Sequence, residues 1–148
     1  MTAVAAGCVL PAPPTGADDI PCPVTGTVGF RNDFGEARAG GRTHEGVDVF
    51  APRGRTNVAV VDGTIVHRFD PAGGNTIWLT GKDATRYVYA HLDGYAGPPR
   101  MVTAGDVIGY TGDSGNAQGT HTHFEIRPNG GSAENPYTTL VEACPSRT

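Results

Sequence analysis

Alternating apolar and polar positions mark short strands along most of the chain after residue 24. Such runs predict strands at 58–61, 64–69, 75–80, 86–92 and 121–127, with a further short hairpin inside 101–110. Asp62-Gly63 and Gly105-Asp106 are typical of tight hairpin turns, and 81–85 of a turn between neighbouring strands. No apolar run repeats every 3.6 residues over a long stretch. We therefore expect a mainly β domain, built on antiparallel sheets with short hairpins.

The first 24 residues have a different composition. They contain Pro11, Pro13, Pro14, Pro21 and Pro23 among Ala, Thr and Asp, and such a segment buries too little apolar surface to fold. We expect residues 1–24 to be a disordered linker or leader and residues 25–148 to form the domain. The apolar stretch at 4–10 is too short for a complete signal peptide, and no run of the chain predicts a membrane span.

Length and charge narrow the class of protein. A chain of 148 residues fits one domain that can bury its own core, so we expect a monomer. The net charge of -4 argues against a nucleic-acid partner, because proteins that bind phosphate backbones gather Lys and Arg on one face.

The three cysteines are Cys8, Cys22 and Cys144, and none has the spacing of a structural zinc or redox site. Because Cys22 and Cys144 stand near the two ends of the predicted domain, we favour a disulfide between them and an oxidising compartment. Other pairings and free thiols remain open, and Cys8 is then the unpaired cysteine.

Strand alternation sorts the histidines. In 121–126, Phe124 and Ile126 should point into a core, while His121, His123 and Glu125 share the opposite face. In 87–92, the same rule places Tyr87, Tyr89 and His91 on a polar, aromatic face, so His91 can line the same cavity. His67 has no acidic or imidazole neighbour in sequence, and we interpret it as an ordinary, partly exposed histidine.

His44 and Asp48 form a further candidate pair. Four fully extended residues span about 13 Å, which is too far for both side chains to bind one zinc ion, so the chain must bend between them. Gly46 makes that bend easy, and Val47 and Val49 disfavour a helix. An H-x-x-x-D segment with a strand H-x-H is a plausible ligand set that leaves a coordination position for water. Glu45 and Glu125 are either neighbours that orient these ligands or, by a slight preference, solvated acids.

Three glycine-rich segments, 34–42, 93–100 and 112–120, lie close in sequence to these histidines. Loops on a β scaffold commonly wall binding clefts, and we expect a groove between them, with Tyr87, Tyr89 and Tyr95 as possible wall residues.

The motifs resemble those of the lysostaphin-type zinc endopeptidases, in the order of that family. They are Arg42-Thr43-His44-Glu45-Gly46-Val47-Asp48, Tyr89-Ala90-His91-Leu92, and Gly119-Thr120-His121-Thr122-His123-Phe124-Glu125. The resemblance runs from about residue 26 to 140, and Thr120 and Thr122 stand where many relatives have Pro and Leu.

The resemblance implies Zn²⁺ bound by His44, Asp48 and His123, with His91 and His121 as catalytic histidines beside the metal. It also implies a secreted or cell-envelope enzyme that cuts the peptide part of bacterial peptidoglycan. Which peptide bond is cut, and which histidine is the base, stay open. The alternatives are a non-catalytic wall-binding or regulatory module of the same fold, an amidase that cuts the sugar-to-peptide amide, and a purely structural zinc site.

Overall fold

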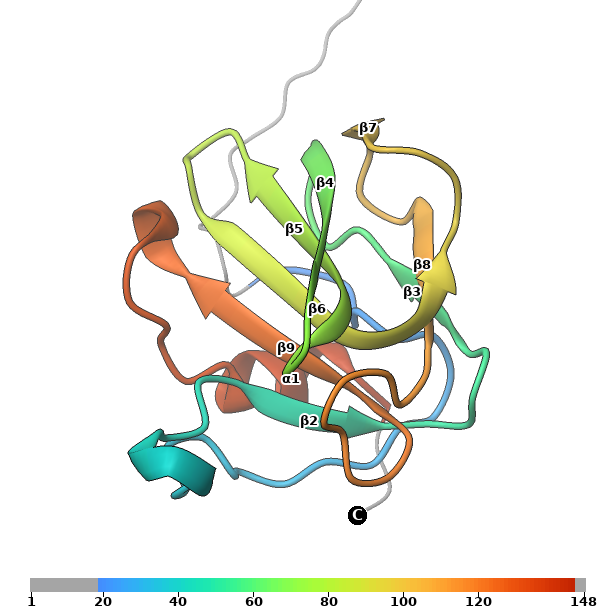
Figure 1. Ribbon diagram of the computed structural model, residues 1–148. Helices are drawn as coiled ribbons and strands as arrows, with labels where there is room; N and C mark the ends of the chain where they lie inside the picture. The colour runs from blue at the N-terminus through green and yellow to red at the C-terminus, as the bar shows by residue number, and fades with distance from the viewer. Residues whose placement is uncertain (1–18, 146–148) are drawn as a thin grey trace, which may run out of the picture.

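The computed structural model describes residues 19–145. Eight strands form one antiparallel sheet in the order β2-β9-β6-β5-β4-β7, and β3 and β8 extend it through the pairing of β8 with β6 (Figure 1). The strands are β2 (Val47–Phe50), β3 (Thr56–Val58), β4 (Gly63–Asp70), β5 (Gly74–Gly81), β6 (Arg86–Tyr95), β7 (Arg100–Val102), β8 (Val107–Thr111) and β9 (His121–Arg127). The mainly β, antiparallel prediction is confirmed.

The helical elements are short. Two 3₁₀ turns, η2 (Ala39–Gly41) and η3 (Pro128–Gly130), precede β2 and follow β9, and the single α-helix of the described residues is α1 (Tyr137–Ala143). None of the helices within 19–145 has the length and apolar character needed to cross a membrane.

One face of the sheet carries the core. Tyr87 and Tyr89 from β6 pack against Phe124 of β9, with ring centroids 6.2 and 5.4 Å apart. Ile20 and Leu140 from the two ends of the described chain belong to the same buried cluster. The N-terminal segment and α1 therefore cover the core face, as their position behind β6 and β9 shows (Figure 1).

The predicted linker reaches too far into the domain. Ile20 and Val24 are buried, and Val24 pairs with Asn57 of β3. Cys22 and Cys144 form the favoured disulfide, with their α-carbons 4.8 Å apart. Residues 20–24 therefore belong to the folded unit, because their few apolar side chains complete its core. The predicted disorder of residues 1–18, and the position of Cys8, lie outside the described residues.

Both predicted tight hairpins are wrong. The strand before Asp62-Gly63 is β3, which pairs with β8 and not with β4. The backbone of 59–60 instead donates to Asp106 and to the hydroxyl of Tyr89. Gly63 is needed for close approach rather than for a turn, since a Cβ there would overlap the Thr80 carbonyl oxygen.

Gly105-Asp106 does form a turn, with Gly105 at a φ of 96° and the Asp106 N–H donating to Thr103. However, the strands on its two sides have different partners, because β7 pairs with β4 while β8 pairs with β3 and β6. By contrast, the predicted turn at 81–85 joins β5 and β6, which are paired along most of their length.

Candidate metal centre

An open groove of about 840 Å³ lies on the sheet face opposite the core. Its floor comes from β2, β5, β6 and β9. The predicted wall loops 34–42 and 112–120 do line it, through residues such as Arg38 and Asn116. The third predicted wall, 93–100, contributes no residue, because it begins as the end of β6 and then leads to β7. The turn between β4 and β5, with Asp70 and Gly73, takes its place.

His121, His123 and Glu125 all line the groove, as the alternation in β9 predicts. The alternation in β6 is predicted wrongly, because Val88 and Ala90 face the groove while the tyrosines on either side of them are buried in the core.

His91 nevertheless reaches the groove. Its φ is 65°, and the pairing of β6 shifts register next to it. This irregularity turns His91 to the same side as Ala90 and returns Leu92 to the core. The expectation that Tyr87, Tyr89 and Tyr95 wall the groove is wrong: Tyr87 and Tyr89 are core residues, and Tyr95 stacks on His67. His67 is half-buried outside the groove, as expected.

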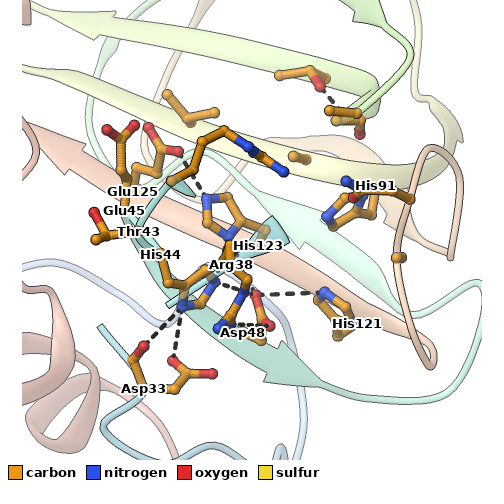
Figure 2. Close-up of a pocket in the computed structure, with 18 of the residues that line it drawn as sticks. Asp33, Arg38, Thr43, His44, Glu45, Asp48, His91, His121, His123 and Glu125 are labelled. Carbon is orange, nitrogen blue, oxygen red and sulfur yellow. Dashed lines mark hydrogen bonds and ion pairs between the residues drawn. The ribbon is translucent and has the colours of Figure 1, made fainter. Parts of the chain in front are cut away.

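Three ligand-type atoms converge on the groove floor. His44 Nε2 lies 3.0 Å from Asp48 Oδ1 and 3.0 Å from His123 Nδ1, and the last two atoms are 3.2 Å apart (Figure 2). The chain bends between His44 and Asp48 as predicted. A Cβ on Gly46 would overlap the backbone of Phe124, so glycine lets this bend lie against β9.

This triangle fits a metal ion. Ligands bound tetrahedrally to zinc at about 2.0–2.1 Å lie about 3.3 Å from one another, close to the spacing of the three atoms. His44, Asp48 and His123 form a group able to hold a metal among the described residues. Two imidazoles and one carboxylate are also the donor types that zinc accepts in sites that keep a position for water.

Each of the two imidazoles is oriented through its other nitrogen. His44 Nδ1 donates to the carbonyl of Asp33 at 3.0 Å, and the Asp33 carboxylate lies 3.4 Å away (Figure 2). His123 Nε2 donates to Glu125 at 2.7 Å. These bonds orient His44 Nε2 and His123 Nδ1 toward Asp48, and in the neutral rings those two nitrogens are the ones left free to bind a metal.

Glu125 is therefore not the solvated acid that the sequence favoured. Its side chain is 12% exposed and also accepts from Arg127 at 2.7 Å, and Arg127 in turn bonds Glu45 at the groove rim. Sequence analysis missed Asp33 altogether. No spacing or alternation marks it, because its role depends on a loop that folds back against His44.

In the ligand cluster of His44, Asp48 and His123, the carboxylate and the two imidazoles change one another's pKa values. Burial alone would lower the pKa of His44, but hydrogen bonds to Asp33 and Asp48 outweigh burial and raise it to about 10. Burial likewise opposes the upward pKa shift of His123, which hydrogen bonds to Asp48 and Glu125 produce. Burial would raise the pKa of Asp48, yet its bonds with His123 and His44 hold it well below its usual range. The Asp48 carboxylate and the two imidazoles thus stabilise one another's charged forms.

His91 and His121 form a second pair beside this cluster. Their ring centroids are 5.0 Å apart, and His121 Nε2 lies 3.4 Å from Asp48 (Figure 2). Each Nδ1 donates to a backbone carbonyl, that of Ser114 at 2.8 Å and that of Gly119 at 3.1 Å. Burial lowers the pKa of His91 to about 4 and also lowers the pKa of His121. Both rings are therefore neutral near pH 7, with Nε2 free to accept a proton.

The sequence model of peptidase family M23 matches residues 42–136, so the chain belongs to this family of metallopeptidases. The match takes in His44, Asp48, His91, His121 and His123, but Asp33 lies outside it.

Individual relatives agree with this assignment. The chain is 33% identical over 144 residues to the L-Ala--D-Glu endopeptidase of Bacillus subtilis, covering 84% of this chain and 43% of the relative. It is 36% identical over 90 residues to the DD-carboxypeptidase/endopeptidase Mpg of Neisseria meningitidis serogroup B, covering 60% of this chain and 21% of the relative. The chain thus spans less than half the length of these relatives.

Among solved structures, the catalytic domain of lysostaphin from Staphylococcus simulans superposes with a TM-score of 0.69 at 31% identity. The superposition covers 77% of this chain and 92% of that domain.

Proposed function

We propose that the chain is a zinc-dependent endopeptidase that hydrolyses peptide bonds in the stem peptides or cross-links of bacterial peptidoglycan. His44, Asp48 and His123 hold the metal. The observation that carries the proposal is the convergence of these three ligand atoms, beside two further histidines, on the floor of an open groove. The M23 relatives are named as endopeptidases, which gives the reaction class.

Zinc, when bound, supplies a water of lowered pKa and polarises the carbonyl of the bond to be cut. The protein supplies the proton transfer. Because Nδ1 of His91 and of His121 is committed to a carbonyl, the neutral ring offers Nε2 as the acceptor. A ring that has taken a proton there can donate it to the developing oxyanion or to the leaving amine.

Asp33 and Glu125 have a different task in this proposal. They fix the rings of His44 and His123 and place negative charge behind them, which strengthens both imidazoles as ligands.

The groove is also open enough for a peptide chain to reach the proposed metal site. Its open form lets an extended peptide lie across the sheet next to the metal ligands, and the loops at 36–45 and 116–118 form its two rims. A peptide already fixed in a large polymer needs such an open site.

We place the enzyme outside the cytoplasm, in the cell envelope or secreted, and acting as a monomer. The Cys22–Cys144 disulfide supports an oxidising compartment, and the proposed substrate is a wall polymer. We further propose that the metallopeptidase domain includes residues 20–24, which complete its core.

The test is digestion of purified peptidoglycan of several cross-link types by the zinc-loaded protein, before and after a chelator, with fragments identified by mass spectrometry. We expect zinc-dependent products cut within the peptide, and none from His123→Ala. Release of whole stem peptides would indicate the amidase. A folded, zinc-loaded sample that cuts no wall type would contradict the proposal and favour the non-catalytic wall-binding module.

A further inference from the structure

Two arginines stand apart from the others in residues 19–145. The guanidinium groups of Arg68 and Arg86 form no hydrogen bond and no ion pair there, and Nε of Arg86 is buried without a partner. The remaining arginines of this part all donate to carbonyl or carboxylate oxygens: Arg31, Arg38, Arg42, Arg53, Arg55, Arg100 and Arg127.

Both unpaired guanidinium groups lie on Trp78. The central carbon of Arg68 is 4.0 Å from the ring centroid and that of Arg86 is 3.9 Å from it. Two groups at this distance must occupy opposite faces of the ring, and β4 and β6 do lie on the two sides of β5. Such stacking holds each guanidinium plane without using its N–H groups, which stay available for an acceptor.

Trp78 and Arg86 line the same groove as the ligand cluster. Along β6, Ala90 is in register with His123, and Arg86 is in register with Arg127. The α-carbons of Ala90 and Arg86 are four strand residues apart, or about 13 Å. An extended peptide lying in the groove would therefore reach Arg86 within two to four residues of a bond cut at the metal, since the arginine side chain itself shortens the gap.

The charge of Arg86 is not neutralised by the protein. Its neighbour Arg127 is paired with Glu125 and Glu45, and Arg38 lies near Glu36 and Asp48. The floor of the groove thus presents one positively charged, planar donor that has no acceptor of its own. A carboxylate matches this group, because its two oxygens can accept two parallel N–H groups of the planar guanidinium at once.

We propose that Arg86, held flat by Trp78 and Arg68, binds a free carboxylate of the peptide substrate. The inference rests on the proposed function and narrows it, because a stem peptide carries free carboxylates whereas a bridge made only of glycine carries none along its length. Arg86 is then a specificity-determining residue, and Arg68 is a positioning residue that supports Trp78 from its other face.

Trp78 makes the test direct, because it is the only tryptophan in the chain. Its fluorescence can report binding without cleavage, in the zinc-loaded His121→Ala variant. The probes are acidic tetrapeptides with all carboxylates free, with only the terminal carboxylate amidated, with only the internal carboxylate amidated, and with both amidated.

We expect the acidic peptide to bind about 10- to 100-fold more tightly than the fully amidated one, as for one charge-assisted pair. The single amidation that abolishes this preference identifies which carboxylate Arg86 holds. Adding Arg86→Gln should make the acidic and amidated peptides bind equally. Arg86→Lys should restore only part of the preference, because lysine keeps the charge but not the planar fork.

Lys82→Gln is the matched control. Lys82 is exposed at the turn before β6 and does not line the groove, so its loss removes the same charge nearby and should leave the preference intact.

Equal binding of the acidic and fully amidated peptides, absence of saturable binding, or a preference that survives Arg86→Gln would overturn the inference. The comparison of peptides on one protein keeps the test valid even where Arg86→Gln fails to fold. The protein with His121 intact separates the two proposals. If it cleaves peptidoglycan but shows no preference for free carboxylates, only the proposed carboxylate subsite is contradicted. If it prefers free carboxylates in binding but cleaves nothing, only the proposed peptidase activity is contradicted.

Discussion

Two pairs of histidines line one groove, but the ring nitrogens that point away from the proposed metal have different partners in the two pairs. His123 donates its outer nitrogen to the Glu125 carboxylate, and His44 donates its outer nitrogen to the Asp33 carbonyl with the Asp33 carboxylate 3.4 Å away, so each ring has a carboxylate behind it. The outer nitrogens of His91 and His121 instead face backbone carbonyls in the loop at 112–120. The first pair has raised pKa values and the second pair lowered ones, although all four rings are largely buried.

The difference shows that burial alone does not decide what a histidine can do. Burial opposes charge on every one of these rings, and hydrogen bonds to carboxylates reverse that effect for His44 and His123, from Asp48 on the metal side as well as from Asp33 and Glu125 behind. An anion behind the ring suits a ring that must hold a cation. A neutral carbonyl suits a ring that must start uncharged and accept a proton.

Removing one ring of the first pair, His44 and His123, should reduce zinc binding and activity most. We expect His44→Ala to lose tightly bound zinc and to reduce peptidoglycan cleavage by more than about 1000-fold, because two remaining ligands hold zinc poorly. Metal content by atomic absorption and the rate of fragment release are the measurements. His67→Ala is the matched control, since His67 lies outside the groove, and it should retain zinc and activity.

Breaking the second pair should separate chemistry from metal binding. We expect His121→Ala to keep its zinc while kcat falls by about 100- to 10,000-fold, the usual contribution of a general acid or base. Zinc content and kcat are measured on the same sample. A His121→Ala protein that loses its metal would show that the two pairs do not have distinct roles.

Removing the negative charge behind one metal-binding ring should reduce zinc affinity and activity least. We expect Glu125→Gln to reduce zinc affinity about 10- to 100-fold, because the amide keeps a hydrogen bond to His123 but removes the charge. Excess zinc should restore most of the activity. Glu45→Gln, at a side chain that is 56% exposed, should change zinc affinity little. Equal losses in the two variants would argue against a special role for the charge behind His123.

Local features of the sequence could single out four candidate site residues, His44, Asp48, His121 and His123. The division of these residues into metal ligands and catalytic histidines came only from the family resemblance, and the contact of His123 with Asp48 depends on the pairing of β9 with β2. Alternation in β9 places His121 and His123 together, and the bend at Gly46 lies within five residues of chain. Asp33 could not be found in this way, since nothing near it in sequence shows that it will contact His44.

The errors in strand faces and in hairpins have different physical causes. The face of β6 was predicted wrongly because one residue at positive φ, His91, changes the phase of the alternation, and a strand pattern carries no sign of such a shift. The two hairpins were predicted wrongly because turn residues show where a chain reverses, but not which strands become partners.

The Cys22–Cys144 disulfide closes a loop with a sequence separation of 122 residues, and every groove residue discussed above lies inside that loop. A protease that nicks the backbone at any one place between the two cysteines therefore releases no fragment. The glycine-rich loops that wall the groove are the exposed kind of segment where such cuts concentrate. In covalent terms the domain is a ring, and a ring that is cut once is still a single molecule.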